Sequence, residues 1–535
     1  MKPFVRLSIC LLLALAPRLA AAQTVPAPAP ANPGAEPAAT SPAPDSGPPN
    51  TAADAPEPAP APVPVPTPAP APAAPAPNPT LAKGVEWTSL RLLKAKGVIS
   101  EAEYLSALKD MGEVVGAAEA NTLVVSKVKL TLYGFTQADF TYDSTQSCQE
   151  FCSNAAIQRP GSYRGDHARM VFSPRDSRFG VRIATTEEHS IKASGLLETD
   201  FFGPTTTTEA GTWVNPVLRI RHAYLKLETP IVDVLIGQTW SLFGWGAAYL
   251  MTSAQEPGLP GQLFQRTPQI RLTKAIKTGA GVTIELAAAM NRPPQMDSAT
   301  PEGVAGVRIL LDKLTGYHTL YLSGSVTQPA SIAVTGDLRG FRVSEFSAAP
   351  KTYHWRTGGG FAVDAFIPII SATKTKHDNA LSISGELAVS QGTSDMYTGL
   401  GAAGTVNAAI PPAMAGGTPG TYTPNFDVGL AAYDAAGHLE LIKWTSYMIG
   451  AELYPGGVGG RLGLFGNYGH MESSNTKDFA GPNARKSEDF FDIGLFVDPT
   501  KQTRIGADYG YYKDDYVSGR NGINHSVMTS AWLFF

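Results

Sequence analysis

Five arginines fall on the polar face of alternating segments, and they are the residues whose type and spacing suggest chemistry. They are Arg178, Arg182, Arg271, Arg461 and Arg504. Successive side chains in a strand point to opposite faces, so apolar neighbours such as Phe179 and Ile270 lie on the other side. A guanidinium that faces water can hold a carboxylate through two parallel hydrogen bonds. An ordinary ion pair with a nearby acidic side chain is the competing interpretation.

Acidic residues share this polar side, so the arginines could face an acidic wall. These residues are Glu198, Asp200, Glu386 and Asp508. The segment from Arg219 to Tyr224 does not keep a single alternation phase, and a β-bulge near His222 would restore the register. We expect His222 to be a hydrogen-bond partner rather than a catalyst.

Motifs of common catalytic and cofactor sites do not occur in the sequence. It has no nucleophile elbow, HExxH motif, phosphate-binding loop or dinucleotide fingerprint. The nine histidines are scattered without the spacing of metal ligands. We therefore expect no enzyme, no cofactor and no metal site.

Two cysteines, Cys148 and Cys152, lie close together in a polar stretch. In an oxidising compartment we expect them to form a disulfide that fixes a loop. A metal site is the alternative, but it would need further Cys or His residues at ligand spacing.

Two-residue alternation runs from about Val128 to the end of the chain. No run of about 18 apolar residues follows residue 22, so membrane-spanning helices are not expected. The predicted fold class is all-β, a transmembrane antiparallel β-barrel over residues 128–535. At roughly 25 residues per strand and connection it has about 16 strands, with about 14 or 18 as alternatives. A soluble sandwich or propeller also alternates, but it would repeat at a fixed period.

The longest connections and the aromatic residues refine this prediction. Candidate long loops are 143–167, 203–216, 245–266, 392–424 and 471–487, rich in turn-forming residues. We expect 245–266 to fold into the interior. Aromatic side chains near proposed strand ends are expected to form interface girdles: Tyr133, Phe135, Tyr142, Phe201, Phe202, Trp240, Phe243, Trp245, Tyr511, Tyr512, Trp532 and Phe534.

The chain stops on Phe535, at the close of an alternating strand. A terminal Phe resembles the signal that barrel-assembly machinery reads in bacterial outer-membrane proteins. Met528, Trp532 and Phe534 make the second face of this strand partly apolar. We expect that part to meet a girdle or a neighbouring subunit.

The region before the barrel divides into three parts. Residues 1–22 read as a signal peptide, with Lys2 and Arg6 before an apolar core and a small-residue cleavage pattern. Residues 23–80 form a Pro/Ala-rich linker that is expected to be disordered. Residues 81–118 have near-helical apolar spacing and a capping box at Ser100 and Glu103, which predicts a short helical hairpin or oligomerising segment.

Five strings of the first half resemble the DcaP-like porins of Gram-negative bacteria. They are FSPRDSRFGVRI, LLETDFFG, LRIRHAYLKLETP, VLIGQTWSLF and RTPQIRLT, and the resemblance runs from Leu130 to about Lys274. It implies a trimeric outer-membrane channel, with a helical segment before the barrel, that takes up small and often anionic solutes such as dicarboxylates. By this match Arg219 and Arg221 join Arg178 and Arg271 as candidate pore-lining residues.

The function expected is a water-filled channel for passive diffusion of small hydrophilic, carboxylate-type solutes. The alternatives are a phosphate- or anion-selective porin of the O/P type and a barrel-anchored peptidoglycan tether. Expected partners are small anionic solutes, outer-membrane lipid, further copies in a homotrimer, and peptidoglycan. A net charge of −4 does not favour nucleic acid. The expected location is the bacterial outer membrane, with the N-terminal region in the periplasm.

Overall fold

The computed structural model describes most of residues 128–535 and a few short pieces before them. The gaps are 153–154, 186–189, 205–211, 213, 255–257, 294–297, 321–323, 345–350, 374, 401–429, 434–437 and 480–481. The earlier pieces are 93–94, 96–98, 100, 103, 115–116 and 122–125. The predicted signal peptide (1–22), the linker (23–80) and most of the helical segment (81–118) lie outside the described residues.

The predicted capping box is present. The backbone N–H of Ser100 donates to Glu103 Oε2 at 2.8 Å, and the backbone N–H of Glu103 donates to Ser100 Oγ at 3.2 Å. The hydrogen bonds from Ser100 lower the pKa of the Glu103 carboxyl. This reciprocal pattern satisfies two donors at the start of a helix.

Nearly all regular structure in the described residues is β-strand. The strands are β1 (Val115–Gly116), β2 (Thr122–Val125), β3 (Val128–Asp143), β4 (Arg169–Ser173), β5 (Arg178–Thr185), β6 (Lys192–Asp200), β7 (Arg219–Glu228), β8 (Asp233–Trp240), β9 (Arg266–Lys277), β10 (Val282–Asn291), β11 (Glu302–Leu320), β12 (Gly324–Ser344), β13 (Tyr353–Ile370), β14 (Ala380–Gln391), β15 (Ala431–Tyr433), β16 (Leu439–Leu441), β17 (Lys443–Tyr454), β18 (Leu462–Ser473), β19 (Arg485–Val497), β20 (Thr503–Tyr516) and β21 (Gly522–Phe534). The helical turns are η3 (Phe243–Tyr249), η5 (Ser394–Met396) and α4 (Thr476–Phe479). Among the residues described, no helix has the length and apolar character needed to cross a membrane.

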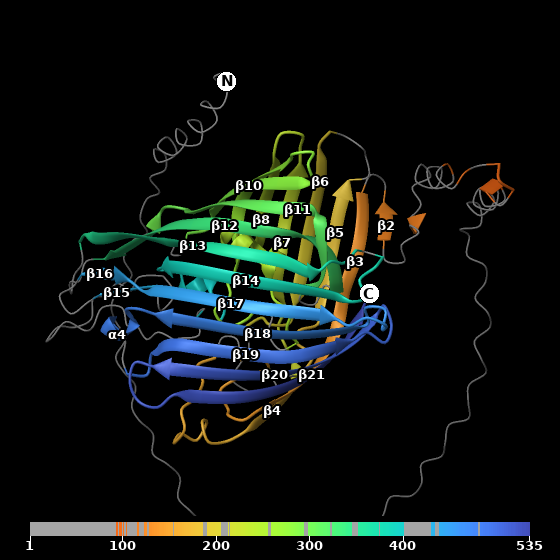
Figure 1. Cartoon of the computed structure of the whole chain (residues 1–535). Coiled ribbons are helices and arrows are strands. Elements are labelled where there is room, and N and C mark those ends of the chain that lie inside the picture. Colours follow the sequence, from red (N-terminus) through yellow and green to blue (C-terminus); the bar gives the residue numbers. More distant parts are fainter. Residues whose placement is uncertain are drawn as a thin grey trace, which may run out of the picture. The chain divides into compact units, whose positions relative to one another are not determined.

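Sixteen of these strands close into one antiparallel barrel (Figure 1). Each strand from β5 to β14 and from β17 to β21 pairs with the next barrel strand, and β21 pairs back with β3. Both β4 and β5 pair with β3, so they act as one strand interrupted at 174–177. The predicted fold class and strand number are therefore confirmed.

Apolar side chains cover the outer face of the barrel. In β21 the residues alternate between exposed and buried, with Val527 and Leu533 exposed and Asn524 and Ser526 buried. Other strands do the same, and Ile449 is 54% exposed. An apolar face costs about 25 cal/mol per Å² in water. Contact with hydrocarbon removes this cost, which is why transmembrane barrels carry such a band.

Long connections gather at one end of the barrel, which we call the loop end. They join the strands at 144–168, 201–218, 241–265, 392–442 and 474–484. The opposite end, which we call the turn end, carries short turns, the start of β3 and Phe535 (Figure 1).

The connection 241–265 folds into the interior, as predicted for 245–266. We call it the inserted loop. Its backbone N–H groups and hydroxyls bind side chains of distant strands. Gly244 N–H donates to Thr335 Oγ1 of β12 at 3.0 Å, Thr252 Oγ1 donates to Glu452 of β17 at 2.8 Å, and Ala254 N–H donates to Asp508 of β20 at 2.9 Å. The loop starts and ends at β8 and β9, and these bonds hold it against strands β12, β17 and β20 on other sides of the barrel.

The expectation that Met528 and Trp532 meet a girdle or a neighbouring subunit is wrong. Both are buried inside the barrel, at 0% and 3% exposure. Trp532 packs there with Phe496 and with Ala254 of the inserted loop. Other aromatics predicted at the interface are also buried inside: Phe135, Phe243 and Tyr512. An apolar segment that crosses the interior needs apolar wall partners, and these inward residues supply them.

The last residue of the sequence makes a tight contact with β3, next to the pairing of β21 and β3 that closes the barrel. The N–H of Phe535 donates to Gly134 O, and the N–H of Gly134 donates to Phe535 O, both at 3.1 Å. A Cβ atom on Gly134 would lie 2.2 Å from the backbone oxygen of Arg178 and 2.8 Å from the Phe535 ring. Only glycine therefore fits between β5 and the chain end.

We expect Gly134→Ala to lower the folded fraction of the barrel, because the added methyl group pushes β3 away from Arg178 and Phe535. Gly303→Ala is the matched control, since its Cβ would have only one neighbour, at 4.0 Å. Unheated samples on a denaturing gel separate the folded barrel from the unfolded chain. Equal folded fractions for the two variants would contradict the closure argument.

Candidate functional site

A β-bulge in β7 turns two consecutive polar side chains, Arg221 and His222, toward the interior. His222 pairs with Glu198 and Ile220 pairs with Thr199, so Arg221 is the extra residue. The bulge predicted near His222 is thus confirmed. The ring of His222 hydrogen-bonds through Nδ1 to Thr239 Oγ1 at 3.0 Å, as expected of a hydrogen-bond partner.

Two acidic residues of β6 pair with the arginines of β7. Arg221 Nε lies 2.8 Å from Glu198 Oε1, and its Nη1 lies 2.7 Å from Asp200 Oδ2. Arg219 donates to both oxygens of Asp200, at 3.0 and 2.6 Å. Arg221 is 2% exposed, whereas 39% of the Arg219 side chain is exposed. Their charges are largely satisfied by the wall, which favours the ion-pair interpretation for both.

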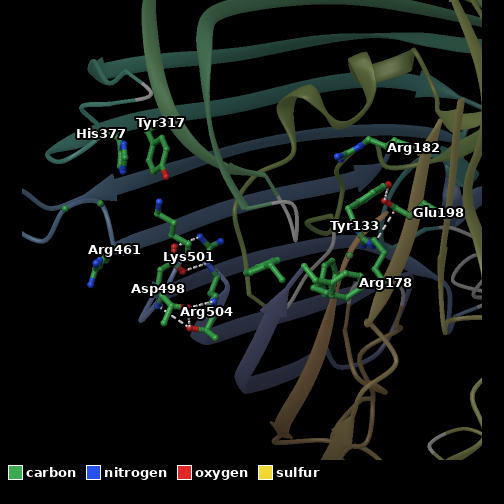
Figure 2. Close-up of a pocket in the computed structure, with 18 residues that line it drawn as sticks. Tyr133, Arg178, Arg182, Glu198, Tyr317, His377, Arg461, Asp498, Lys501 and Arg504 are labelled. Carbon is green, nitrogen blue, oxygen red and sulfur yellow. Dashed lines mark hydrogen bonds and ion pairs between the residues drawn. The ribbon is translucent and has the colours of Figure 1, made fainter. Parts of the chain in front are cut away.

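A cavity of about 730 Å³ opens at the turn end. We call it the vestibule. Its lining is Tyr133, Gly134, Phe135, Arg178, Arg182, Glu198, Tyr317, His377, Gly459, Gly460, Arg461, Asp498, Thr500, Lys501, Thr503, Arg504, Phe534 and Phe535. Figure 2 shows two groups facing each other. One comes from β3, β5 and β6, and the other comes mainly from short turns and from β11 and β20.

Cations outnumber carboxylates in the vestibule. Five basic side chains line it, against the two side-chain carboxylates of Glu198 and Asp498. Arg504 is held by Asp498, with Nε–Oδ1 and Nη2–Oδ2 distances of 2.7 and 2.8 Å. Among the residues that the structure describes, Arg182, Arg461 and Lys501 form no salt bridge with a carboxylate. The vestibule therefore carries uncompensated positive charge.

Two neighbouring turns position the far side of the vestibule. The Asp378 carboxylate accepts the backbone N–H of Gly457 at 2.9 Å, and this bond lowers the pKa of Asp378. The linked turns bring His377 against Gly460, where an added Cβ would lie 2.2 Å from the His377 ring. Gly460 has a φ of +70°, and Arg461 follows it directly. The turn geometry thus fixes where Arg461 leaves the backbone.

The predicted arginines occupy three different places. Arg178, Arg182, Arg461 and Arg504 line the vestibule. Arg219 and Arg221 lie in the neighbouring strand β7 and do not belong to the vestibule lining. Arg271 lies outside the vestibule, where its Nε donates to Gln269 Oε1 at 2.8 Å and its Nη2 donates to Trp240 O.

Sequence analysis missed Lys501 and His377. Both lie in short turns at the turn end, between β19 and β20 and between β13 and β14. Residues in turns have no two-residue period, so alternation carries no signal for them. Their position between two predicted strands, on the end that carries Phe535, was the available clue.

The two cysteines lie at the loop end, next to the β3–β21 seam. Cys148 and Cys152 form a disulfide with a Cα–Cα distance of 4.8 Å, and both are buried. Asn524 Nδ2 donates to Asp143 Oδ1 at 2.9 Å beside them. Although Asp143 and the two sulfurs cluster closely, joined sulfurs are not thiolate ligands. The arrangement connects the loop 144–168 to both seam strands.

No protein-family model and no curated protein sequence matches the chain. Solved structures do. The chain is similar to the outer membrane channel DcaP of Acinetobacter baumannii, with 18% identity and a TM-score of 0.54, over 77% of this chain and 98% of that one. It is also similar to an anion-selective porin from Comamonas acidovorans, with 13% identity and a TM-score of 0.42, over 76% of this chain and 100% of that one. A third is Salmonella typhi OmpF in complex with daunomycin, with 10% identity and a TM-score of 0.45, over 76% and 98%.

The similarity to DcaP establishes the class of fold. The chain forms a closed barrel of the outer-membrane channel type. More narrowly, the resemblance to DcaP-like porins stated from the sequence is confirmed at the level of the fold.

We expect Arg221→Ala to destabilise the barrel by about 3–5 kcal/mol, because it leaves the buried Glu198 and Asp200 without a full set of partners. Arg219→Ala is the matched variant on the same strand. Its side chain is partly exposed, so we expect about 1 kcal/mol or less. Urea unfolding of the barrel in lipid vesicles measures both. A loss for Arg221→Ala no larger than that for Arg219→Ala would contradict the assignment of Arg221 as the buried centre of this cluster.

Proposed function

We propose that the protein is an outer-membrane porin, a water-filled channel for passive diffusion of small hydrophilic solutes, with a preference for carboxylate-type anions. The fold supports the channel, since it is shared with an outer membrane channel. The preference for anions is supported by one observation, the excess of cations in the vestibule.

The uncompensated cations explain how such a channel selects charge. Two unit charges 4 Å apart interact by about 1 kcal/mol in water and by about 4 kcal/mol near a protein surface. Even the lower figure favours an anion over a neutral solute by roughly fivefold. Because Arg182, Arg461 and Lys501 come from separate elements, an anion meets positive charge on both sides of the vestibule.

Stacking on an aromatic ring orients the Arg182 side chain. Its Cζ lies 3.9 Å from the centroid of the Tyr133 ring, and Tyr133 OH donates to Glu198 Oε2 at 2.6 Å. A guanidinium stacked on a ring keeps its N–H edges free for planar carboxylates. This geometry supports a carboxylate preference over a purely electrostatic preference for any anion.

The same proposal includes the setting of the channel. The barrel spans the outer membrane in contact with its lipid, the N-terminal region lies in the periplasm, and three copies assemble as the DcaP resemblance implies. We assign it no enzymatic activity and no cofactor. Native mass measurement of the detergent-extracted protein tests the trimer, and a mass of one chain would contradict it.

Planar-bilayer recording tests the function directly. In a salt gradient the purified protein should conduct, and its reversal potential should show a preference for chloride over potassium. We expect the triple variant Arg182→Glu, Arg461→Glu, Lys501→Glu to lower the chloride-to-potassium permeability ratio by at least about fivefold. Current should also be blocked by succinate at lower concentration than by phosphate, which separates a carboxylate channel from the phosphate-selective alternative.

Lys277→Glu is the matched control for charge. This exposed lysine lies at the turn end of β9 and does not line the vestibule. The control should keep the wild-type reversal potential. Absence of conductance would contradict the channel, and an unchanged permeability ratio in the triple variant would contradict anion selection at the vestibule.

A further inference from the structure

We infer that a second segment, Gly392–Leu400, enters the interior and forms the size-limiting constriction together with the inserted loop. We call it the second segment. The inference rests on the proposed function, because a constriction has meaning only in a channel. It assigns the restriction of solute size to different residues from those that select charge.

Backbone hydrogen bonds join the two segments inside the barrel. Leu263 and Tyr397 form an antiparallel bridge. Three bonds surround it: Gly261 N–H to Thr398 O at 2.8 Å, Thr398 N–H to Gln262 O at 2.8 Å, and Phe264 N–H to Met396 O at 2.9 Å. The second segment is therefore paired with the inserted loop rather than merely next to it.

Apolar packing fills the space around this pairing. Side chains of both segments belong to one buried cluster. The members that the two segments contribute are each no more than 3% exposed: Leu242, Phe243, Leu263, Met396, Tyr397 and Leu400. The wall contributes further members to this cluster, among them Trp444 and Met471 at 1% exposure each. Interiors packed in this way leave few voids larger than a water molecule. The joined segments therefore obstruct this part of the interior.

Two buried arginines hold the ends of the second segment from different walls. Arg339 of β12 donates to Gly392 O at 3.1 Å and lies 2.6 Å from Asp395. Arg485 of β19 donates to Gly399 O at 2.6 Å. Both side chains have 0% exposure, and both also contact carboxylates of the wall, Arg339 at Glu302 and Arg485 at Asp514. The anchors keep the second segment inside the barrel.

The barrel wall also holds the inserted loop, so the position of this loop does not depend only on its pairing with the second segment. Glu386 Oε1 accepts the backbone N–H of Leu263 at 2.8 Å. Ser253 Oγ donates to Asp508 Oδ2 at 3.0 Å. With both segments anchored and paired, solutes have to pass beside them. The pairing thus sets the width of the passage.

Cysteine cross-linking tests whether the segments are paired in the membrane. In Leu263→Cys/Tyr397→Cys, oxidation should join the two cysteines, since bridged antiparallel positions lie within disulfide reach. The cross-linked protein should conduct as the wild type does. The two segments are already paired in the wild type, so the disulfide does not narrow the passage further. Failure to cross-link, or loss of current on cross-linking, overturns the inference.

Loosening the second segment tests its effect on size. Thr398→Pro removes the N–H that binds Gln262 O and leaves the barrel strands unchanged. We expect unitary conductance to rise by roughly twofold and larger sugars to enter vesicles, since pore diameter sets the size limit. Thr398→Ala is the matched control, since it changes the same side chain but keeps the N–H that binds Gln262 O. It should behave as the wild type.

The outcomes separate this inference from the proposed function. If the wild type conducts and Thr398→Pro has the same conductance and the same sugar size limit, only the constriction is overturned. Absence of current through both the wild type and Thr398→Pro overturns the channel itself. If Thr398→Pro gives no folded barrel on an unheated gel, the cross-linking result decides the inference.

Discussion

The structure depends on the closure of the sheet between β21 and β3. Hydrocarbon offers no hydrogen-bond partner, so an open sheet edge would leave a row of unsatisfied backbone groups. Phe535 and Gly134 complete the closure at the turn end, through paired bonds of 3.1 Å. At the loop end, Asn524 binds Asp143 beside the disulfide. Both ends of the same seam are thus held by specific contacts.

Once the outer face is apolar, the interior must carry the polar side chains, and the structure divides them between two tasks. Glu386 and Asp508 were expected to form an acidic wall opposite the arginines. Instead they accept N–H groups of the inserted loop, at 2.8 and 2.9 Å, and hold it across the barrel. Arg182 and Lys501 are left to face the vestibule. Glu386 and Asp508 therefore anchor the inserted loop, while Arg182 and Lys501 line the vestibule.

Alternation in the sequence predicts the strands well, because each outward face must be apolar wherever lipid contacts it. It also predicts which face Arg178 and Arg182 occupy. Alternation could not predict that Trp532 packs inside the barrel. It assigns a side chain to one face of the strand, but it does not show whether a loop packs against that face. The site was harder still, because Lys501 and His377 lie in turns without periodicity. The second segment depends on contacts between residues far apart in the chain, such as Gly399 and Arg485.

The origin of the vestibule charges has a consequence for how this protein can diversify. Arg461, Lys501 and His377 belong to short turns and strand edges, not to the middle of the barrel wall. Exchanging these turns leaves strand register, outer face and closure untouched. A few turn substitutions can therefore change the charge of the vestibule without changing the contacts that close the barrel.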